Sequence, residues 1–113
     1  MQKNKTLSML GMARRAGRLS MGHDMAEKSI KAHKAQMVLI CRDASKRLVK
    51  EFERTLENFK HDIPLIVADI TINEIHFAVG YKAGIMTVDD VNFSKKIISL
   101  IEQEENASGN ESS

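Results

Sequence analysis

The feature that most constrains the fold is a run of five consecutive apolar residues, Met37-Val38-Leu39-Ile40-Cys41. A strand that is apolar at every position has no face to offer to solvent. Such a run is typical of a central parallel strand covered by helices on both faces. A second run, Ile63-Pro64-Leu65-Ile66-Val67, predicts another buried strand, with its proline near the start, where the missing N–H is tolerated. Together the two runs predict a sheet between two layers of helices.

Helix and strand patterns alternate along the rest of the chain. A short strand over residues 18–21 leads through Gly22 into a helix that should end near residue 34. Thr71 and Glu74 match a capping box, and the helix they begin should end near Gly80. Further helices are expected at about 5–16, after residues 43–45 and from about 91, and a last strand at 85–88. Asp43 and Ser45 can both cap the helix that follows them. The total of five helices and four short strands predicts an α/β fold, a three-layer α/β/α sandwich with a central four-stranded mixed sheet.

The chain has the length of one domain and a mildly basic folded part. Its 113 residues carry a formal charge of +2. The segment from Glu104 lacks large apolar residues and is predicted to be a disordered acidic tail over residues 104–113. Because three acidic residues lie in that tail, the single domain at residues 1–103 carries +2 plus 3, or +5. A basic surface of this kind favours a polyanionic partner.

Several classes of protein are disfavoured by what the sequence lacks. No apolar stretch approaches the roughly 20 residues that span a bilayer, and no signal-type run follows the N-terminus. The single cysteine, Cys41, cannot form an intramolecular disulfide and reads as a small hydrophobe, so we expect a soluble, cytoplasmic protein that does not contact membranes. The four histidines are scattered, without cysteine or carboxylate partners at ligand spacing, and no known catalytic or phosphate-loop motif occurs. We therefore predict no enzyme activity, no metal site and no cofactor.

The helix that begins after Gly22 is the first candidate for a binding site. The first N–H groups of a helix have no partner within it, and the helix dipole is positive there, so a phosphate is a natural ligand. Arg18 precedes this turn, and Lys28 and Lys31 follow it on adjacent faces of the helix, where they can track one nucleic-acid backbone. The same residues also fit a plain structural reading, in which Gly22 supplies a tight turn and the lysines are solvated. If the loops at 22–24, 42–45 and 80–84 lie at one end of the sheet, they form a composite surface of free N–H groups, basic side chains and apolar tips.

The order of these features resembles the L7Ae family of ribosomal proteins. The resemblance rests on the glycine-opened helix with Lys28, the strand end Arg42-Asp43-Ala44, the strand start Ile63-Pro64 and the helix end Ala78-Val79-Gly80. The opening stretch over residues 10–19 and the later Asn92-Phe93-Ser94-Lys95-Lys96 are closer to the bacterial YlxQ-type branch. The likeness covers residues 5 to about 101.

The resemblance implies an α/β/α sandwich that binds RNA kink-turns, which are sharply bent internal loops with tandem sheared G·A pairs. The family signature Gly-x-Asn-Glu-x-x-Lys reads Gly22-His23-Asp24-Met25-Ala26-Glu27-Lys28 here. Gly22 and Lys28 take over the close backbone approach and the cationic contact, whereas Asp24 and Met25 replace the family's asparagine and glutamate. The RNA-binding residues we predict are Arg18, Gly22, His23, Asp24, Lys28, Lys31, Asp43, Tyr81, Lys82 and Ala83.

Two functions remain open on the sequence. The first is a non-catalytic, monomeric RNA-binding protein that recognises kink-turn-like RNA in a ribosomal or other ribonucleoprotein context. In this reading Tyr81, the only tyrosine, stacks on an exposed base, although it also fits a packed helix-end residue. The alternative is a protein-interaction module on the same fold, because two recognition residues of the signature are replaced.

Overall fold

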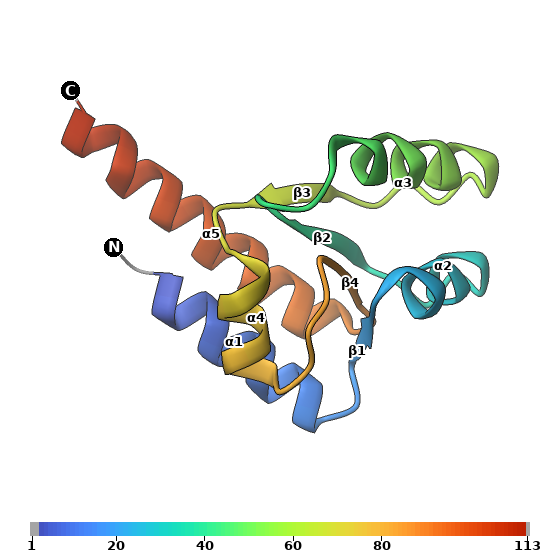
Figure 1. The fold of residues 1–113 in the computed structure, drawn as a ribbon, viewed down its shortest axis with the longest axis horizontal. Coiled ribbons are helices and arrows are strands. Elements are labelled where there is room, and N and C mark those ends of the chain that lie inside the picture. Colours follow the sequence, from blue (N-terminus) through green and yellow to red (C-terminus); the bar gives the residue numbers. More distant parts are fainter. Residues whose placement is uncertain (1–2, 113) are drawn as a thin grey trace.

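The computed structural model describes residues 3–112, with side chains described for residues 4–104. It contains the predicted five helices and four strands in the predicted order (Figure 1). The elements are α1 (Lys3–Arg15), β1 (Leu19–Met21), α2 (His23–Lys31), β2 (Met37–Cys41), α3 (Lys46–Asn58), β3 (Leu65–Ala68), α4 (Ile72–Val79), β4 (Ile85–Val88) and α5 (Val91–Ser112).

The four strands form one mixed sheet in the order β1-β4-β2-β3. Strand β2 runs parallel to β3, while β4 is antiparallel to both β1 and β2. The carboxyl ends of β1, β2 and β3 therefore share an edge of the sheet with the amino end of β4. We call this edge, made of residues 22–24, 42–45, 69–71 and 80–84, the loop edge.

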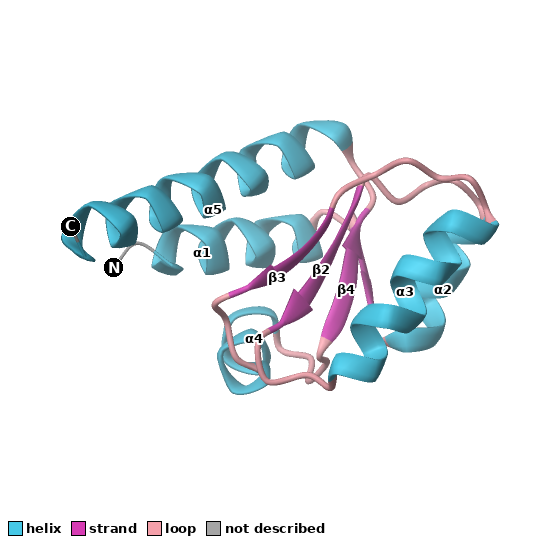
Figure 2. Ribbon diagram, turned by 90° about the horizontal axis from the view of Figure 1, so that it is seen from above, coloured by secondary structure: helices cyan, strands magenta, loops and turns pink. Residues whose placement is uncertain are grey.

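The position of β2 between two hydrophobic cores explains why its sequence is apolar at every position. Met37, Leu39 and Cys41 pack into a core with α1, α4 and α5. Val38 and Ile40 point the other way, into a second core with α2 and α3. All five side chains are buried. Figure 2 shows the sheet between these two groups of helices, so the predicted three-layer α/β/α sandwich is confirmed.

Strand β3 differs from its predicted form. It begins at Leu65 rather than Ile63 and lies at the edge of the sheet, where Val67 is 47% exposed. Pro64 has no N–H to donate, but its carbonyl accepts a hydrogen bond of 2.9 Å from the N–H of Val38. The apolar run therefore belongs to an edge strand, and the prediction of a second fully buried strand is wrong.

Helix α2 ends three residues before the expected end at residue 34. The N–H groups of His33 and Lys34 turn back to the carbonyls of Ile30 and Ser29. His33 has a φ of 56°, in the left-handed region that stops a helix. Because the sequence offers no glycine there, this end was not visible in the pattern.

Helix α5 continues to Ser112, through the segment for which the sequence predicts disorder. Its packed part reaches Glu104, whose carboxylate accepts a 2.8 Å hydrogen bond from the hydroxyl of the buried Thr6 on α1. A helix bonds its own backbone without needing apolar side chains, so loss of the apolar pattern does not by itself end it. The division at residue 103 stays a prediction. Within the described part of the chain, no helix is both long and apolar enough to cross a membrane.

Candidate nucleic-acid interface

The start of α2 leaves backbone donors open. Gly22 has φ 88° and ψ 168°, a conformation that only glycine adopts readily. Its N–H donates to the carbonyl of Ile85 at 2.9 Å, which fixes the turn against β4. No side chain caps the helix, so the N–H groups of its first turn have no acceptor in the described protein and can bind an anion.

The loops at the loop edge are held together by backbone contacts. The N–H of Cys41 donates to the carbonyl of Gly84 at 2.8 Å, and that of Arg42 donates to Ile70 at 3.0 Å. A Cβ placed on Gly84 would lie 3.2 Å from that of Ala44, so the 80–84 and 42–45 loops approach closely. The structure thus brings the three loops to one end of the sheet, the condition for a composite surface.

A groove of about 640 Å³ runs beside α2 and the edge strand β1. Lys28 and Lys34 line it, together with Arg18, which lies at the amino end of β1 and thus away from the Gly22 turn. Asp89 also lines the groove and accepts hydrogen bonds from the hydroxyls of three side chains. These are Ser20 at 2.6 Å, Ser29 at 2.7 Å and Thr87 at 2.8 Å. Three cationic side chains and one carboxylate whose oxygens are already hydrogen-bonded thus line the same groove.

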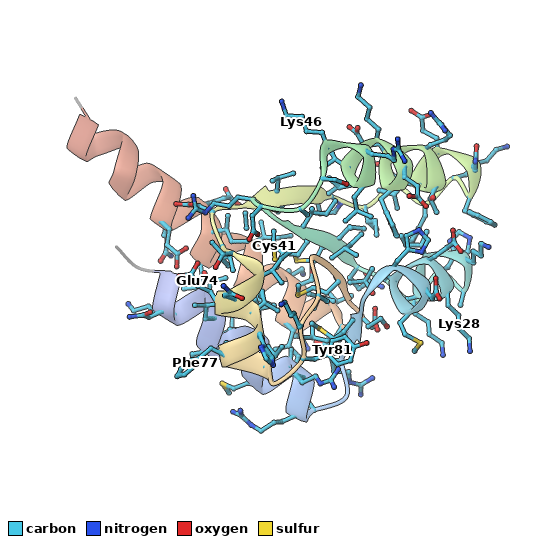
Figure 3. The ribbon with its side chains drawn as sticks, in the orientation of Figure 1. Lys28, Cys41, Lys46, Glu74, Phe77 and Tyr81 are labelled. Atoms are coloured by element: carbon cyan, nitrogen blue, oxygen red, sulfur yellow. The ribbon has the colours of Figure 1, made fainter. Side chains whose placement is uncertain are left out.

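The two lysines of α2 have different surroundings. Lys28 projects away from the body of the protein, as Figure 3 shows, and has no ion-pair partner among the described residues. Lys31 lies 3.5 Å from Glu27 and 5.6 Å from the ring centroid of Phe59, on the side that faces α3. Lys28 is therefore available to a phosphate, whereas Lys31 is engaged in contacts within the protein.

Tyr81 and its neighbours lie at the end of α4. Tyr81 is 46% exposed (Figure 3). The guanidinium carbon of Arg14 lies over its ring, 5.3 Å from the ring centroid. Lys82 is exposed, while Ala83 packs partly against the core below α1 and α4. The exposed face of this loop is thus an aromatic ring with cationic groups beside it.

Asp43 has a different local role from the capping role that the sequence allows. Its carboxylate accepts a 3.0 Å hydrogen bond from the N–H of Ile72, at the start of α4. Ser45 caps α3, with its hydroxyl accepting from Leu48. Because Ile72 is distant in the sequence, no local pattern marked this contact, and the prediction that Asp43 can cap α3 is wrong.

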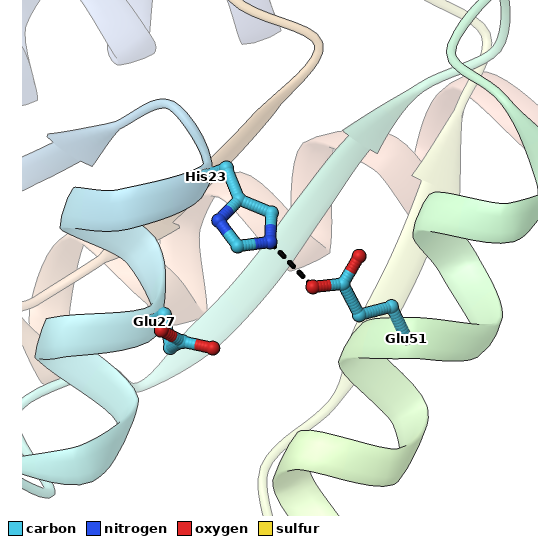
Figure 4. A group of neighbouring side chains, drawn as sticks. All are labelled: His23, Glu27 and Glu51. Atoms are coloured by element: carbon cyan, nitrogen blue, oxygen red, sulfur yellow. Dashed lines mark hydrogen bonds and ion pairs between the residues drawn. The ribbon is translucent and has the colours of Figure 1, made fainter.

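His23 is surrounded by carboxylates, contrary to the expectation drawn from the sequence. Its Nδ1 lies 3.0 Å from Asp24, and its Nε2 contacts Glu51 of α3 (Figure 4). The hydrogen bond to Glu51, then that to Asp24, raise the pKa of His23 above its usual value. Glu51 was missed because it is 28 residues away and only the packing of α2 beside α3 brings it close.

The structure thus sorts the predicted site residues into groups. Four of them lie at the loop edge and are exposed or half-buried, four are engaged with the protein itself, and two line the groove. The first group is Gly22, Asp24, Tyr81 and Lys82; the second is His23, Lys31, Asp43 and Ala83; the third is Arg18 and Lys28. Glu51 and Asp89 are the neighbours that sequence reasoning missed, and neither stands near a local motif.

Comparison with known proteins places the chain in a known family. Residues 4–98 match the model of the ribosomal protein L7Ae/L30e/S12e/Gadd45 family, and the chain belongs to that family. The resemblance found in the sequence is thereby confirmed. Membership of this family, with relatives named for RNA binding rather than for catalysis, supports the prediction that the chain is not an enzyme.

Individual proteins of known sequence or structure are also similar to this chain. The chain is 25% identical over 100 residues to the RNA-binding protein YlxQ of Enterococcus faecium, covering 88% of this chain and 94% of that protein. It is 27% identical over 95 residues to the YlxQ of Bacillus subtilis (strain 168), with 83% and 92% covered. A structure of a protein of unknown function from Bacillus halodurans superposes with a TM-score of 0.77 at 27% identity, over 87% and 97% of the two chains. The 15.5 kD RNA-binding protein of Giardia lamblia shares the fold, with a TM-score of 0.68 at 15% identity over 93% and 88%.

Proposed function

We propose that this chain is a non-catalytic RNA-binding protein whose interface consists of residues 22–24, 42–45 and 80–84 of the loop edge together with the groove beside α2. The observation that carries the proposal is the start of α2, where Gly22 leaves the first-turn N–H groups uncapped. Lys28, which has no ion-pair partner among the described residues, lines the adjoining groove. Uncapped donors and a free cation on one helix suit a phosphate backbone.

The relatives support RNA as the polyanion. Both bacterial relatives are named as RNA-binding proteins, and each is matched over more than nine-tenths of its own length. We propose a structured, kink-turn-like RNA as the target, bound by one copy of the chain in a cytoplasmic ribosomal or other ribonucleoprotein context. The positive charge of residues 1–103 favours such a partner.

Each part of the interface has a physical task in this proposal. The N–H groups after Gly22 approach the RNA backbone, and Lys28 and Arg18 neutralise phosphates. The ring of Tyr81, already under the Arg14 guanidinium, stacks on an unpaired base, and Lys82 adds a phosphate contact. Asp24 accepts hydrogen bonds from base edges but repels phosphate, so it selects which RNA groups fit beside the turn.

The test is calorimetric titration with a kink-turn RNA and with the same RNA whose two G·A pairs are replaced by Watson–Crick pairs. Both titrations are made at one stated salt concentration, because phosphate-driven affinity depends steeply on salt. Selective binding of the kink-turn supports the full proposal. Equal weak binding to both RNAs retains RNA binding but rejects kink-turn recognition, and absence of binding to either rejects the proposal.

A protein-interaction module is the second candidate function, and one observation favours it. Phe77 on α4 is 94% exposed, and Met12 of the neighbouring α1 is 46% exposed. A contiguous exposed apolar patch is a feature of protein-binding surfaces, and the two residues stand on helices that pack against each other. Salt discriminates between the two functions, because phosphate contacts weaken steeply as salt rises whereas an apolar protein contact does not.

A further inference from the structure

Two helices bring three potential metal ligands to one place beside the start of α2. His23 and Glu27 lie one turn apart on α2, and Glu51 reaches them from α3 (Figure 4). One ring nitrogen and one oxygen from each carboxylate all lie within 4.8 Å of one another. Within the described part of the chain, this is the one group of at least three such side chains at this spacing.

The donor set suits a divalent transition-metal ion. Imidazole nitrogen and carboxylate oxygen are ligands of Zn²⁺, with metal–ligand distances of about 2.0–2.2 Å. Three donors around one such ion lie roughly 3.4 Å apart in a tetrahedral site of that size, so modest rotations of the two glutamate side chains suffice. Three protein ligands leave a fourth position for water or another ligand, as in open zinc sites.

A second observation concerns the orientation of the imidazole. The Nδ1 of His23 lies 3.0 Å from the carboxylate of Asp24, while its Nε2 faces the cluster. Metal-binding histidines commonly donate their other ring N–H to a carboxylate, which fixes the tautomer and the direction of the ring. The edge-on contact with the buried Phe52, with ring centroids 5.2 Å apart, holds the ring further in place.

The cluster is open enough for an ion to enter. The side chains of His23 and Glu51 are 41% and 42% exposed, and that of Glu27 is 33% exposed. The ammonium group of Lys31 lies 3.5 Å from Glu27 and would be displaced without cost to the core, since it is itself on the surface. The site is therefore accessible without any change in the packing of α2 and α3.

We propose that His23, Glu27 and Glu51 bind a divalent transition-metal ion of the Zn²⁺ type, with Asp24 as the residue that positions the imidazole. The ion replaces the proton shared between His23 and Glu51 and joins α2 to α3. It also adds positive charge next to the Gly22 turn. The site does not depend on RNA, so it stands or falls independently of the proposed function.

The experiment is calorimetric titration of the full chain with ZnCl₂, in a buffer that does not bind zinc, for the natural protein and matched variants. We expect one site per chain. His23→Gln and Glu51→Gln each remove a ligand and should weaken binding at least tenfold, as should Asp24→Asn, since loss of a supporting partner typically costs about 10–100-fold. Glu53→Gln, an exposed glutamate on the same α3, is the control and should leave affinity unchanged.

A competing site is tested in the same series. The Nδ1 atoms of His33 and His61 lie 3.3 Å apart, so a pair of histidines is also available to zinc. Binding that survives His33→Gln but not Glu51→Gln supports the proposal, and the reverse result overturns it. Absence of zinc binding by the natural protein also overturns it. Circular dichroism of each variant shows that it is folded, and zinc should raise the Tm of the natural protein but not that of Glu51→Gln.

Discussion

Helices α2 and α4 begin at the same edge of the sheet, yet the backbone N–H groups of the first turn are capped in α4 and uncapped in α2. At α4, the hydroxyl of Thr71 accepts from the N–H of Glu74, and the Glu74 carboxylate accepts from the N–H of Thr71. The carboxylate of Asp43 also accepts a hydrogen bond from the N–H of Ile72. At α2, Gly22 provides no side chain and no cap is present.

The difference lies in the backbone N–H groups that each helix start leaves open. The capping box of α4 consumes its donors within the protein, so that end has little left to offer an anion. The start of α2 keeps its donors and still holds its place, because the N–H of Gly22 is bonded to β4. Stability of the α2 turn thus comes from sheet contact and glycine geometry rather than from a cap.

The largest effect is expected from Gly22→Ala. The φ of 88° and ψ of 168° at Gly22 lie in a region essentially confined to glycine, so alanine should cost about 1–3 kcal/mol of unfolding free energy. No atom lies within 4 Å of the Cβ position, so the cost comes from the backbone and not from a clash. Urea denaturation measures it.

Gly80→Asn is the control for this substitution. Gly80 has φ 77° and ψ 14°, the left-handed region that asparagine tolerates, and its Cβ position is equally open. It should cost clearly less than Gly22→Ala. Equal costs at the two glycines would mean that the Gly22 turn has no special backbone requirement, and the contrast between the two helix starts would lose its basis.

The next effect is expected from Thr71→Ala, which removes the cap of α4. Loss of a threonine N-cap typically costs about 1 kcal/mol of stability. RNA affinity should stay at the natural value at a temperature where the variant remains folded, because this helix start is not part of the proposed interface. Urea denaturation measures the loss of stability, and calorimetric titration measures the RNA affinity. A clear loss of RNA affinity in the folded Thr71→Ala variant would show that the start of α4 also contacts RNA.

Much of the fold follows from patterns that are local in the sequence. The five-residue apolar run placed β2 in the centre, and Thr71 with Glu74 marked the start of α4 through the capping box that the structure contains. Where the signal was not local, the sequence misled. Val67 reads as a core residue but is 47% exposed, because only the strand order places β3 at the edge.

The sequence predicted those parts of the candidate site whose residues are close together in the chain. Gly22 and Lys28 stand in one short segment. The 80–84 loop joins the other two loops only because β4 runs antiparallel to β1 and β2, which the alternation of helices and strands does not determine. The neighbours of the site residues did not follow from the sequence either. Glu51 reaches His23, and Asp89 collects three hydroxyls, through contacts spanning 28 to 69 residues, apart from the local bond to Thr87. Such pairs depend on tertiary packing and leave no periodic trace.

A smaller effect is expected from Lys28→Ala, which removes a cation from the groove without touching the turn. Affinity for the kink-turn RNA should fall, and the slope of log K against log salt concentration should become shallower by about one unit, the signature of one lost phosphate contact. Stability should be unchanged because Lys28 has no ion pair among the described residues. Lys50→Ala on the exposed side of α3 is the matched control. The same loss in both variants would indicate a general charge effect rather than a contact at this surface.

The smallest effect is expected from Asp24→Asn, which should change stability and RNA affinity in opposite directions. An acidic side chain in the first turn of α2 interacts favourably with the helix dipole, so its loss should lower stability slightly, by less than Thr71→Ala. The same carboxylate is fully exposed beside the uncapped donors and repels phosphate, so RNA affinity should rise. Titrations with EDTA present exclude any contribution from a metal ion bound nearby. A general weakening of α2 would lower RNA affinity and unfolding free energy together. A rise in RNA affinity with a fall in stability therefore identifies the start of this helix as the place where the anion binds. A fall in both would place the RNA elsewhere.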